Sequence, residues 1–241
     1  MRLAVLSDVH GHARAFDAAL TAARTEGFDH MLILGDLLTY GVEPERVMEL
    51  TAGATARDGA AVILGNHDQI YFDLAEGGSD YADALPDWIR ESVDWTRDRV
   101  GGSWAAAPWT WLPDWTWGDL YAAHANPYGY GDWTYLSTEA ALQAAAEALA
   151  ARGRRHGVFG HTHRFRTLTA AGVDVVVVGS LGQPRDRQDP CAQWAMLEVG
   201  PGGLTVMPRR VEVDWAAHAA SIRATTLSDS TKDRLCGFFS T

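Results

Sequence analysis

The chain has 241 residues, 47% of them hydrophobic, and a formal net charge of −11. This length suits one globular domain with a single large core, so a metal site would be expected to serve chemistry more than stability. The negative charge argues against a surface that attracts phosphate backbones throughout. Extended nucleic acid is therefore disfavoured as a partner.

The cysteines and the apolar runs indicate the compartment. Cys191 and Cys236 flank no motif, so no disulfide framework is expected, which suits a reducing compartment. The apolar run near the N-terminus is too short for a signal peptide, and no run approaches the ~20 residues of a membrane span. We therefore expect a cytoplasmic protein without a membrane partner.

Short apolar segments alternate with helical patterns in the first part of the chain. Strands are predicted over 2–6, 31–34 and 60–64, and helices over 12–26 and 43–50. Such alternation predicts a parallel sheet with helices on its faces, hence an α/β fold. Each strand is followed at once by polar residues, and ligands bind at the carboxyl ends of strands in sheets of this kind.

The middle of the chain is different, because residues 80–118 are dense in Trp, Pro and Asp. A helix is predicted over 85–100, whereas 103–117 fits no single element. Beyond this segment we expect strands over 120–123, 157–159, 173–178, 195–199 and 204–213, helices over 137–152 and 214–223, and a loose tail from Ser228.

The polar residues after the strands form a set of potential metal ligands. They are Asp8, His10, Asp36, Asn66, His67, Asp68, His124, His161 and His163. Mn, Fe, Zn and Ni accept mixed imidazole and carboxylate ligands. Two such ions ~3.5–4 Å apart can clamp the attacking and leaving oxygens of a displacement at phosphorus. A carboxylate can bridge two ions, so an Asp is expected at the centre with histidines outside.

These residues fall into five ordered motifs. The motifs are Asp8-Val9-His10, Gly35-Asp36, Gly65-Asn66-His67-Asp68, His124 and Gly160-His161-Thr162-His163. In this order they resemble the calcineurin-like metallophosphoesterase superfamily. The later stretch from Gly179 to Arg185 resembles one seen in its small bacterial phosphodiesterase and diadenosine-tetraphosphatase-like branch.

The resemblance implies a fold of two stacked, mixed β-sheets flanked by helices. It implies a single metallophosphoesterase domain over 1–225 with a Trp-rich insert near 80–118, followed by a C-terminal tail over 226–241. It also implies two divalent metal ions as cofactors, with Mn expected first and Fe, Zn or Ni as alternatives.

The resemblance also assigns roles by matching position. Asp8, His10 and His163 would hold one ion, Asn66, His124 and His161 the other, and Asp36 would bridge them. His67 would lie near the phosphate and protonate the leaving oxygen or stabilise the transition state. Asp68 would orient His67. An activated water would attack phosphorus without a covalent phosphoenzyme.

One departure from the family bears on the substrate. Many members carry an Asp three residues after the bridging one, and protein phosphatases follow it with Arg-Gly, whereas here the positions hold Thr39 and Tyr40. A protein phosphatase is therefore disfavoured, as is a symmetrical dinucleotide hydrolase of the kind that shares this motif. Arg14, Arg164 and Arg185 remain as candidate phosphate-binding cations.

The favoured function is hydrolysis of a phosphodiester or phosphomonoester of a small phosphorylated metabolite or nucleotide. One alternative is a binding scaffold that has lost turnover, but such scaffolds usually lack a ligand or the catalytic His, and none is missing here. A nuclease is disfavoured by the acidic charge. The oligomeric state stays open. The other histidines, His12, His30, His156 and His218, are interpreted as structural or solvated.

Five tryptophans crowd the segment before the strand that leads to His124. They are Trp104, Trp109, Trp111, Trp115 and Trp117. The plain interpretation is packing or a subunit interface. The alternative hypothesis is that one or two of these rings wall the metal cleft and stack on a base.

Overall fold

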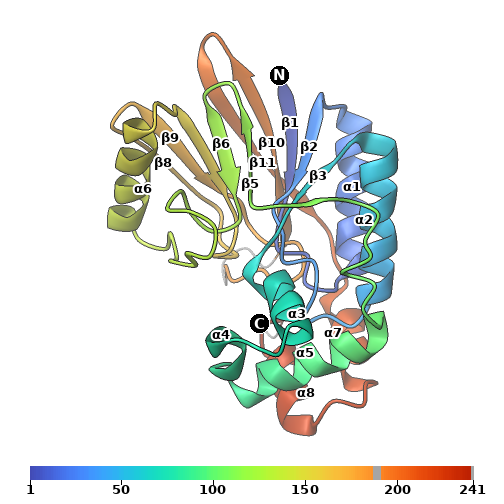
Figure 1. Ribbon diagram of the computed structural model, residues 1–241. Helices are drawn as coiled ribbons and strands as arrows, with labels where there is room; N and C mark the ends of the chain where they lie inside the picture. Colours follow the sequence, from blue (N-terminus) through green and yellow to red (C-terminus); the bar gives the residue numbers. More distant parts are fainter. Residues whose placement is uncertain (187–190, 240–241) are drawn as a thin grey trace.

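The computed structural model describes residues 1–186 and 191–239 and contains two β-sheets that face each other (Figure 1). The first sheet has the order β11 (Gly203–Val211), β10 (Ala192–Gly200), β1 (Arg2–Leu6), β2 (His30–Ile33), β3 (Ala61–Ile63), β4 (Trp111–Leu112). The second has the order β5 (Asp114–Trp117), β6 (Leu120–Ala123), β7 (His156–Phe159), β9 (Val173–Val177), β8 (Arg166–Ala170). Both sheets mix parallel and antiparallel pairs, which confirms the predicted stacked, mixed sheets.

The strands of the first sheet are apolar on both faces. Successive side chains in a strand point to opposite sides. Leu3 and Val5 lie in a core shared with the second sheet, whereas Ala4 and Leu6 pack in a core that includes buried residues of the helices. Those helices are α1 (Ala13–Glu26) and α2 (Pro44–Asp58), which cover the outer face. Burial on both faces explains why these strands are continuous apolar runs.

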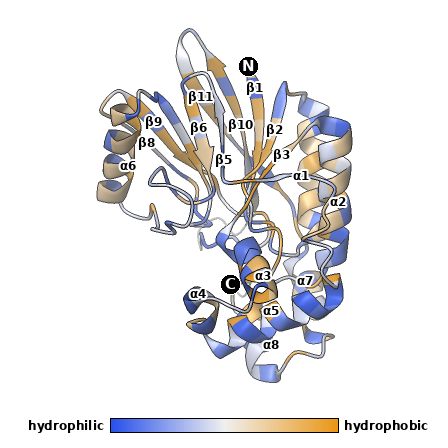
Figure 2. Cartoon of the chain, viewed as in Figure 1, coloured by the Kyte–Doolittle hydropathy of each residue, from blue (hydrophilic) through white to orange (hydrophobic). Residues whose placement is uncertain are grey.

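The second sheet is covered on its outer face by α6 (Glu139–Ala151). Leu142 and Leu149 of this helix pack in one buried cluster with Phe159 and Val175 of the sheet. In Figure 2 the strands of both sheets are largely orange, whereas blue residues face outward on the helices. The result is a layered arrangement of helices, sheet, sheet and helix.

The Trp-rich segment, residues 103–117, connects one sheet to the other. β4 pairs with β3 in the first sheet, and after Pro113 β5 pairs with β6 in the second. Residues 103–117 fit no single element because two short strands of different sheets follow each other here.

Packing explains most of the Trp rings. Trp104 is 6% exposed and lies in the core that also contains Ala4 and Leu6 of β1. Trp109 and Trp111 pack against the same core. Trp115 packs against the core between the sheets. Trp117 is 42% exposed and its ring lies 6.5 Å from that of His30, at the amino end of β2. That end is opposite to the loops that carry the predicted ligands.

We expect Trp104→Ala to lower the free energy of unfolding by about 3–5 kcal/mol, because it empties a large buried site. Trp117→Ala is the matched control, and removal of an exposed ring should change the stability by no more than about 0.5 kcal/mol. Chemical denaturation of both variants measures this. Similar stability of the two variants would mean that the Trp-rich segment is not part of the core.

A second group of helices lies below the sheets in Figure 1. They are α3 (Asn66–Ala75), α4 (Asp80–Asp83), α5 (Asp87–Val100), α7 (Trp215–Arg223) and α8 (Asp229–Cys236). None of the helices in the described ranges is long and apolar enough to cross a membrane.

The expected loose tail is wrong for 229–236, which form α8. The side chain of Ser228 caps this helix by accepting a hydrogen bond from the backbone N–H of Thr231. Leu235 and Cys236 are buried against Ile222 and neighbouring residues. The short segment is thus held by its cap and by tertiary packing. Residues 240–241 of the predicted tail lie outside the described residues.

The end of one other element, and the existence of two more, differ from what was expected. The helix expected to end at Leu50 continues to Asp58 and stops at Gly59, which adopts a left-handed conformation with φ of 65°. Gly53 inside the helix does not end it. α3 and β8 were not expected, and α3 begins directly at the ligand motif Asn66-His67-Asp68.

Candidate metal centre

All seven predicted metal ligands lie in loops after the carboxyl ends of strands or, for Asn66, at the start of α3. All are buried. The structure collects them in two groups: Asp8, His10, Asp36 and His163 in the first, and Asp36, His124 and His161 with Asn66 in the second. Asp36 belongs to both groups.

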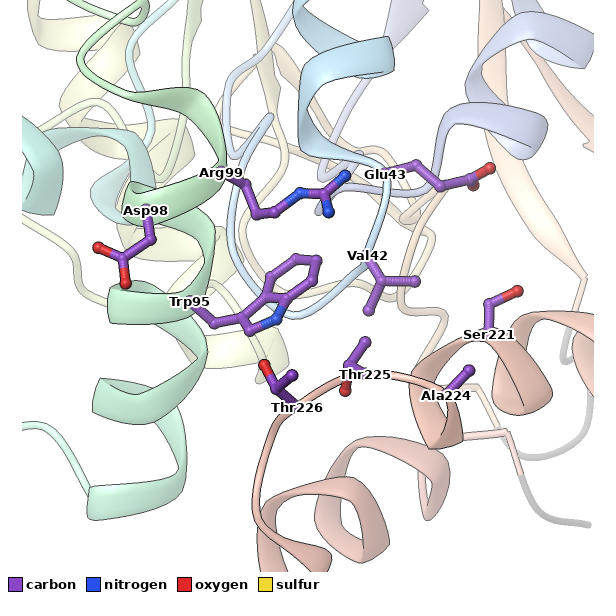
Figure 3. A pocket seen from close by; sticks show the side chains of 9 residues that line it. All are labelled: Val42, Glu43, Trp95, Asp98, Arg99, Ser221, Ala224, Thr225 and Thr226. Carbon is purple, nitrogen blue, oxygen red and sulfur yellow. The ribbon is translucent and has the colours of Figure 1, made fainter.

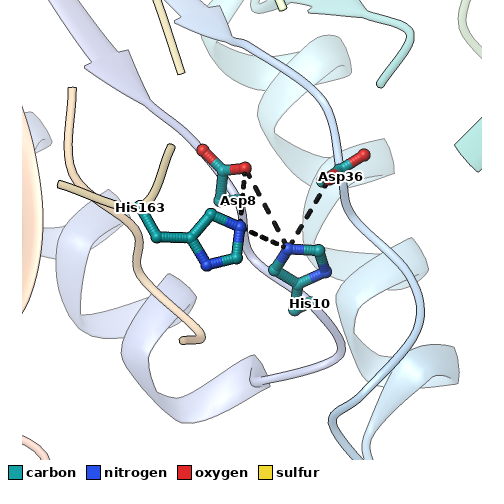
Figure 4. A group of neighbouring side chains, drawn as sticks. All are labelled: Asp8, His10, Asp36 and His163. Atoms are coloured by element: carbon teal, nitrogen blue, oxygen red, sulfur yellow. Dashed lines mark hydrogen bonds and ion pairs between the residues drawn. The ribbon is translucent and has the colours of Figure 1, made fainter. Parts of the chain in front are cut away.

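The first group is drawn in Figure 4. Nε2 of His163 lies 3.2 Å from Oδ1 of Asp8 and 3.1 Å from Nε2 of His10. Nε2 of His10 lies 3.6 Å from Oδ2 of Asp36. Two ring nitrogens and two carboxylate oxygens therefore face one small volume.

The second group repeats this arrangement on the other side of Asp36. Nε2 of His124 lies 3.5 Å from Oδ2 of Asp36, the same oxygen that faces His10. It also lies 3.0 Å from Oδ1 of Asn66 and 3.2 Å from Nδ1 of His161. Because one oxygen of Asp36 faces both groups, this carboxylate has the position needed to bridge two ions.

The outer nitrogen of each of the four histidines faces a backbone carbonyl. The pairs are Nδ1 of His10 with Leu38 at 3.1 Å, Nδ1 of His124 with Leu34 at 2.7 Å, Nδ1 of His163 with Gln183 at 2.8 Å, and Nε2 of His161 with Trp133 at 3.0 Å. A carbonyl only accepts, so each outer nitrogen is the one that carries the proton. In a neutral ring the inner nitrogen is thereby left with a lone pair that points into its group, as metal-binding histidines require.

The two carboxylates are held in the same way, with one oxygen engaged and the other directed into the groups. Oδ2 of Asp8 accepts hydrogen bonds from the hydroxyl of Ser7 and from the backbone N–H of His161, whereas Oδ1 is buried without a hydrogen bond among the described residues. Oδ1 of Asp36 accepts from the backbone N–H of His67, which leaves Oδ2 for the shared position. A buried carboxylate oxygen without a hydrogen-bond donor fits a cation.

The charge states are also compatible with cation binding. Burial lowers the pKa of His161 to about 3 and that of His10 well below its usual value, so both rings are neutral at pH 7. Burial would also lower the pKa of His124, but the charge of Asp36 outweighs it and raises that pKa to about 9. A cation that binds at His124 must therefore displace a proton.

Five of the seven ligands have a left-handed backbone. They are Asp8 (φ 53°), His10 (φ 44°), Asp36 (φ 52°), His161 (φ 66°) and His163 (φ 59°). Such conformations are uncommon for residues other than glycine and cluster at functional sites. Close packing of the loops enforces them: a Cβ on Gly65 would lie 2.2 Å from Oδ1 of Asp36. The glycines of the motifs are thus needed for the approach of the loops.

His67 lies beside the two groups, with its ring 5.2 Å from that of His10, and in the described part of the chain it forms no ion pair with either group. Its Nε2 lies 3.0 Å from the hydroxyl of Tyr40, and its Nδ1 is buried without a hydrogen bond in the described part of the chain. Burial lowers the pKa of His67 to about 4. Tyr40 was not identified from the sequence, because a tyrosine 27 residues away carries no motif signal.

Asp68 contacts backbone instead of the His67 ring that it was expected to orient. Its Oδ1 accepts hydrogen bonds from the N–H groups of Leu37 and Leu38, and its Oδ2 accepts from that of Gly65. Asp68 therefore ties the loop of Asp36 to the start of α3. It positions both ligand groups through the main chain.

A third group contains His12, Glu43 and His218. Nδ1 of His12 accepts the backbone N–H of Ala15 and so caps α1. Its neutral ring then carries the proton on Nε2 and has no lone pair left for a cation. The ring stacks on that of His218 at 3.9 Å. The structural interpretation of His12 and His218 therefore stands.

A pocket between α5 and α7 is separate from both ligand groups (Figure 3). Its lining includes Val42, Trp95, Arg99 and Ser221 and none of the predicted site residues. The guanidinium of Arg99 is paired with the carboxylate of Glu45 at 2.6 Å. The pocket supplies no group to the candidate centre.

Comparison with known proteins agrees with this geometry. The model of the calcineurin-like phosphoesterase superfamily domain matches residues 1–200. An uncharacterized protein of Methanocaldococcus jannaschii is 32% identical over 79 residues, which span 33% of this chain and 30% of that protein.

Two of the solved structures that resemble this chain cover nearly all of it. A metallophosphoesterase from Sphaerobacter thermophilus has a TM-score of 0.74 at 25% identity, covering 99% of this chain and 100% of that chain. A hypothetical protein from Pyrococcus horikoshii OT3 has a TM-score of 0.81 at 20% identity, covering 97% of both, and shows the same fold. Since the family model spans all of the ligand motifs, the chain belongs to the calcineurin-like phosphoesterase superfamily.

Proposed function

We propose that this protein is a two-metal phosphoesterase that hydrolyses a phosphodiester or phosphomonoester of a small metabolite or nucleotide. The observation that carries the proposal is the pair of ligand groups that share Oδ2 of Asp36, each with lone pairs directed inward. Four imidazoles and three oxygen ligands suit Mn²⁺ first, and Fe, Zn or Ni as alternatives. Bound there, two such ions would activate a water and neutralise charge on the phosphate.

The residues of the chain would have distinct roles in binding the ions and in the reaction. Asp8, His10 and His163 would hold one ion, and Asn66, His124 and His161 the other. His67, beside both groups, would stabilise the transition state or protonate the leaving oxygen. Because its pKa is about 4, the second role requires that the anionic phosphate raise that pKa when it binds beside the ring. General acid catalysis of this kind is typically worth ~10²–10⁴ in rate.

Arg185 is the best placed of the candidate phosphate-binding arginines. Its backbone N–H donates to the carbonyl of His163, and its Nη2 donates to Oε1 of Gln183. Arg14, by contrast, lies 3.7 Å from the carboxylate of Glu43.

The experiment is hydrolysis of bis(p-nitrophenyl) phosphate by the purified protein. We expect turnover that requires added Mn²⁺ and is lost with a chelator. Ion binding without turnover on a panel of phosphomonoesters, phosphodiesters and dinucleoside polyphosphates would favour the non-catalytic scaffold instead.

Tyr40 is proposed as the positioning residue of His67. Its backbone is unusual: φ is 68°, that of Thr39 is 72°, and the N–H of Gly41 donates back to the carbonyl of Thr39 at 2.9 Å. A β-branched residue with positive φ is an outlier, and such strain persists only where the surroundings enforce it. Here the backbone N–H of Tyr40 donates to the hydroxyl of Ser92, which helps to hold the strained turn.

We expect Tyr40→Phe to slow hydrolysis of alkyl phosphodiesters about 2- to 10-fold, the value of one hydrogen bond, and to affect nitrophenyl esters less. If the hydroxyl acts through His67, the substitution should add no further loss in a His67→Ala background. Steady-state kinetics of the single and double variants measure this. Full additivity of the two losses would show that Tyr40 acts independently of His67.

A further inference from the structure

Exposed tyrosines gather beside the second ligand group. Among the described residues, five large hydrophobic side chains are strongly exposed: Tyr81, Trp117, Tyr128, Tyr130 and Tyr135. Three of them belong to residues 126–135, the loop between β6 and α6, which we call the tyrosine loop. A fourth, Tyr81, bonds to a predicted ligand. Isolated exposed apolar residues are ordinary, but a concentration at one site is typical of binding surfaces.

The tyrosine loop is fixed by its own hydrogen bonds. Nδ2 of Asn126 donates to the carbonyl and to Oδ1 of Asp132 and to the carbonyl of Thr134. Oδ1 of Asn126 accepts the backbone N–H of Tyr128. The buried Asn126 thus holds both halves of the loop, so the rings are presented without the ordering cost that a flexible loop would add to binding.

Tyr135 packs one ring face against the site and is about half exposed to solvent. Its ring stacks on that of His161 with centroids 4.1 Å apart and an interplanar angle of 22°. The side chain is nevertheless 48% exposed. A flat group that packed on the opposite face of Tyr135 would be separated from the imidazole of a predicted ligand by the tyrosine ring alone.

Tyr81 reaches the same group from another segment. Its hydroxyl accepts a hydrogen bond of 2.8 Å from Nδ2 of Asn66, while the ring is 39% exposed. Two partly open rings from separate segments therefore flank the second ligand group.

We propose that Tyr135 and Tyr81 form a subsite that stacks the base of a nucleoside phosphoester whose phosphate lies at the two ligand groups. The inference rests on the proposed function and narrows its substrate class. Every base has a flat π-face, and stacking one base is typically worth about 5- to 150-fold in affinity. The acidic charge of the chain favours a single nucleotide over a polymer.

The test compares two esters with the same leaving group, thymidine 5′-(p-nitrophenyl phosphate) and methyl p-nitrophenyl phosphate. For each variant, the measured quantity is the ratio of kcat/KM for the nucleoside ester to that for the methyl ester. We expect this ratio to be well above one for the natural protein and to fall about tenfold in Tyr135→Ala. Tyr135→Phe keeps the ring and should keep the ratio. Trp117→Ala removes an exposed ring at the far end of the sheet and is the matched control.

The outcomes separate this inference from the proposed function. A ratio near one in the natural protein, or an unchanged ratio in Tyr135→Ala, would overturn the stacking subsite while leaving the phosphoesterase proposal intact. An equal loss on both esters together with loss of bound Mn²⁺ would show that Tyr135 only supports His161, and would also overturn it. Absence of turnover on both esters in the natural protein would reject the proposed function and this inference with it.

Discussion

Asp36→Asn is expected to weaken the binding of both metal ions, not of one alone, and to lower kcat/KM by at least ~10²-fold. Loss of a residue that only hydrogen-bonds to a metal ligand typically lowers metal affinity or activity 10–100-fold. Asp36 contributes the oxygen that faces both ligand groups, so its loss should cost at least as much. An amide is neutral and cannot replace a bridging carboxylate. Elemental analysis of the purified variant, with turnover measured at saturating Mn²⁺, gives both quantities.

A matched control for this variant is Asp58→Asn. Asp58 is also a largely buried carboxylate, but it pairs with Arg24 between α1 and the end of α2. It should keep both ions and full turnover even if its stability falls. One ion bound with unchanged affinity in Asp36→Asn would contradict the bridging role.

His67→Ala is expected to slow hydrolysis of alkyl phosphodiesters by ~10²–10⁴-fold and that of nitrophenyl esters far less. An alkoxide is a strong base that needs a proton as it leaves, whereas nitrophenolate does not. Rates on a series of esters with leaving groups of increasing pKa measure the effect as a steeper dependence in the variant.

Metal content identifies the cause of the loss in His67→Ala. His67 contacts Tyr40 and is outside both ligand groups, so the variant should keep two ions per chain. An equal loss on alkyl and nitrophenyl esters would leave His67 only an electrostatic role. A fall in metal content would mean that His67 is itself a ligand.

The sequence predicts the ligand groups because each ligand follows a strand. Asp8, Asp36 and Asn66 come after apolar runs that form neighbouring parallel strands β1, β2 and β3, so their carboxyl ends meet at one edge. His124 and His161 follow β6 and β7, which are parallel neighbours in the second sheet. Local patterns and the rules of sheet topology therefore suffice to predict that these residues meet, whereas their division into two groups was implied by the family resemblance.

What the sequence does not predict depends on contacts between distant segments. The bond of Tyr40 to His67 requires two consecutive left-handed residues, Thr39 and Tyr40, which no propensity favours. The exposed Tyr135 beside His161 carries no pattern either. Conversely, the crowded tryptophans suggested that one or two rings stack on a base, whereas Trp104 and its neighbours pack mainly in the cores.

The C-terminal helix illustrates the same limit in the fold. Residues 229–236 are polar overall, and only a few apolar side chains, among them Leu235, indicate a buried face. A short helix of this kind is stabilised by its Ser228 cap and by packing on Ile222. Tertiary packing decides its existence, so the local sequence predicts a loose tail.

The most direct test of the two-metal centre is a crystal structure of the protein grown with Mn²⁺, with anomalous data collected at the manganese edge. We predict two peaks about 3.5–4 Å apart. One should be bound by Asp8, His10 and His163, the other by Asn66, His124 and His161, with Oδ2 of Asp36 between them. A single peak, or two peaks that do not share Asp36, would contradict the account.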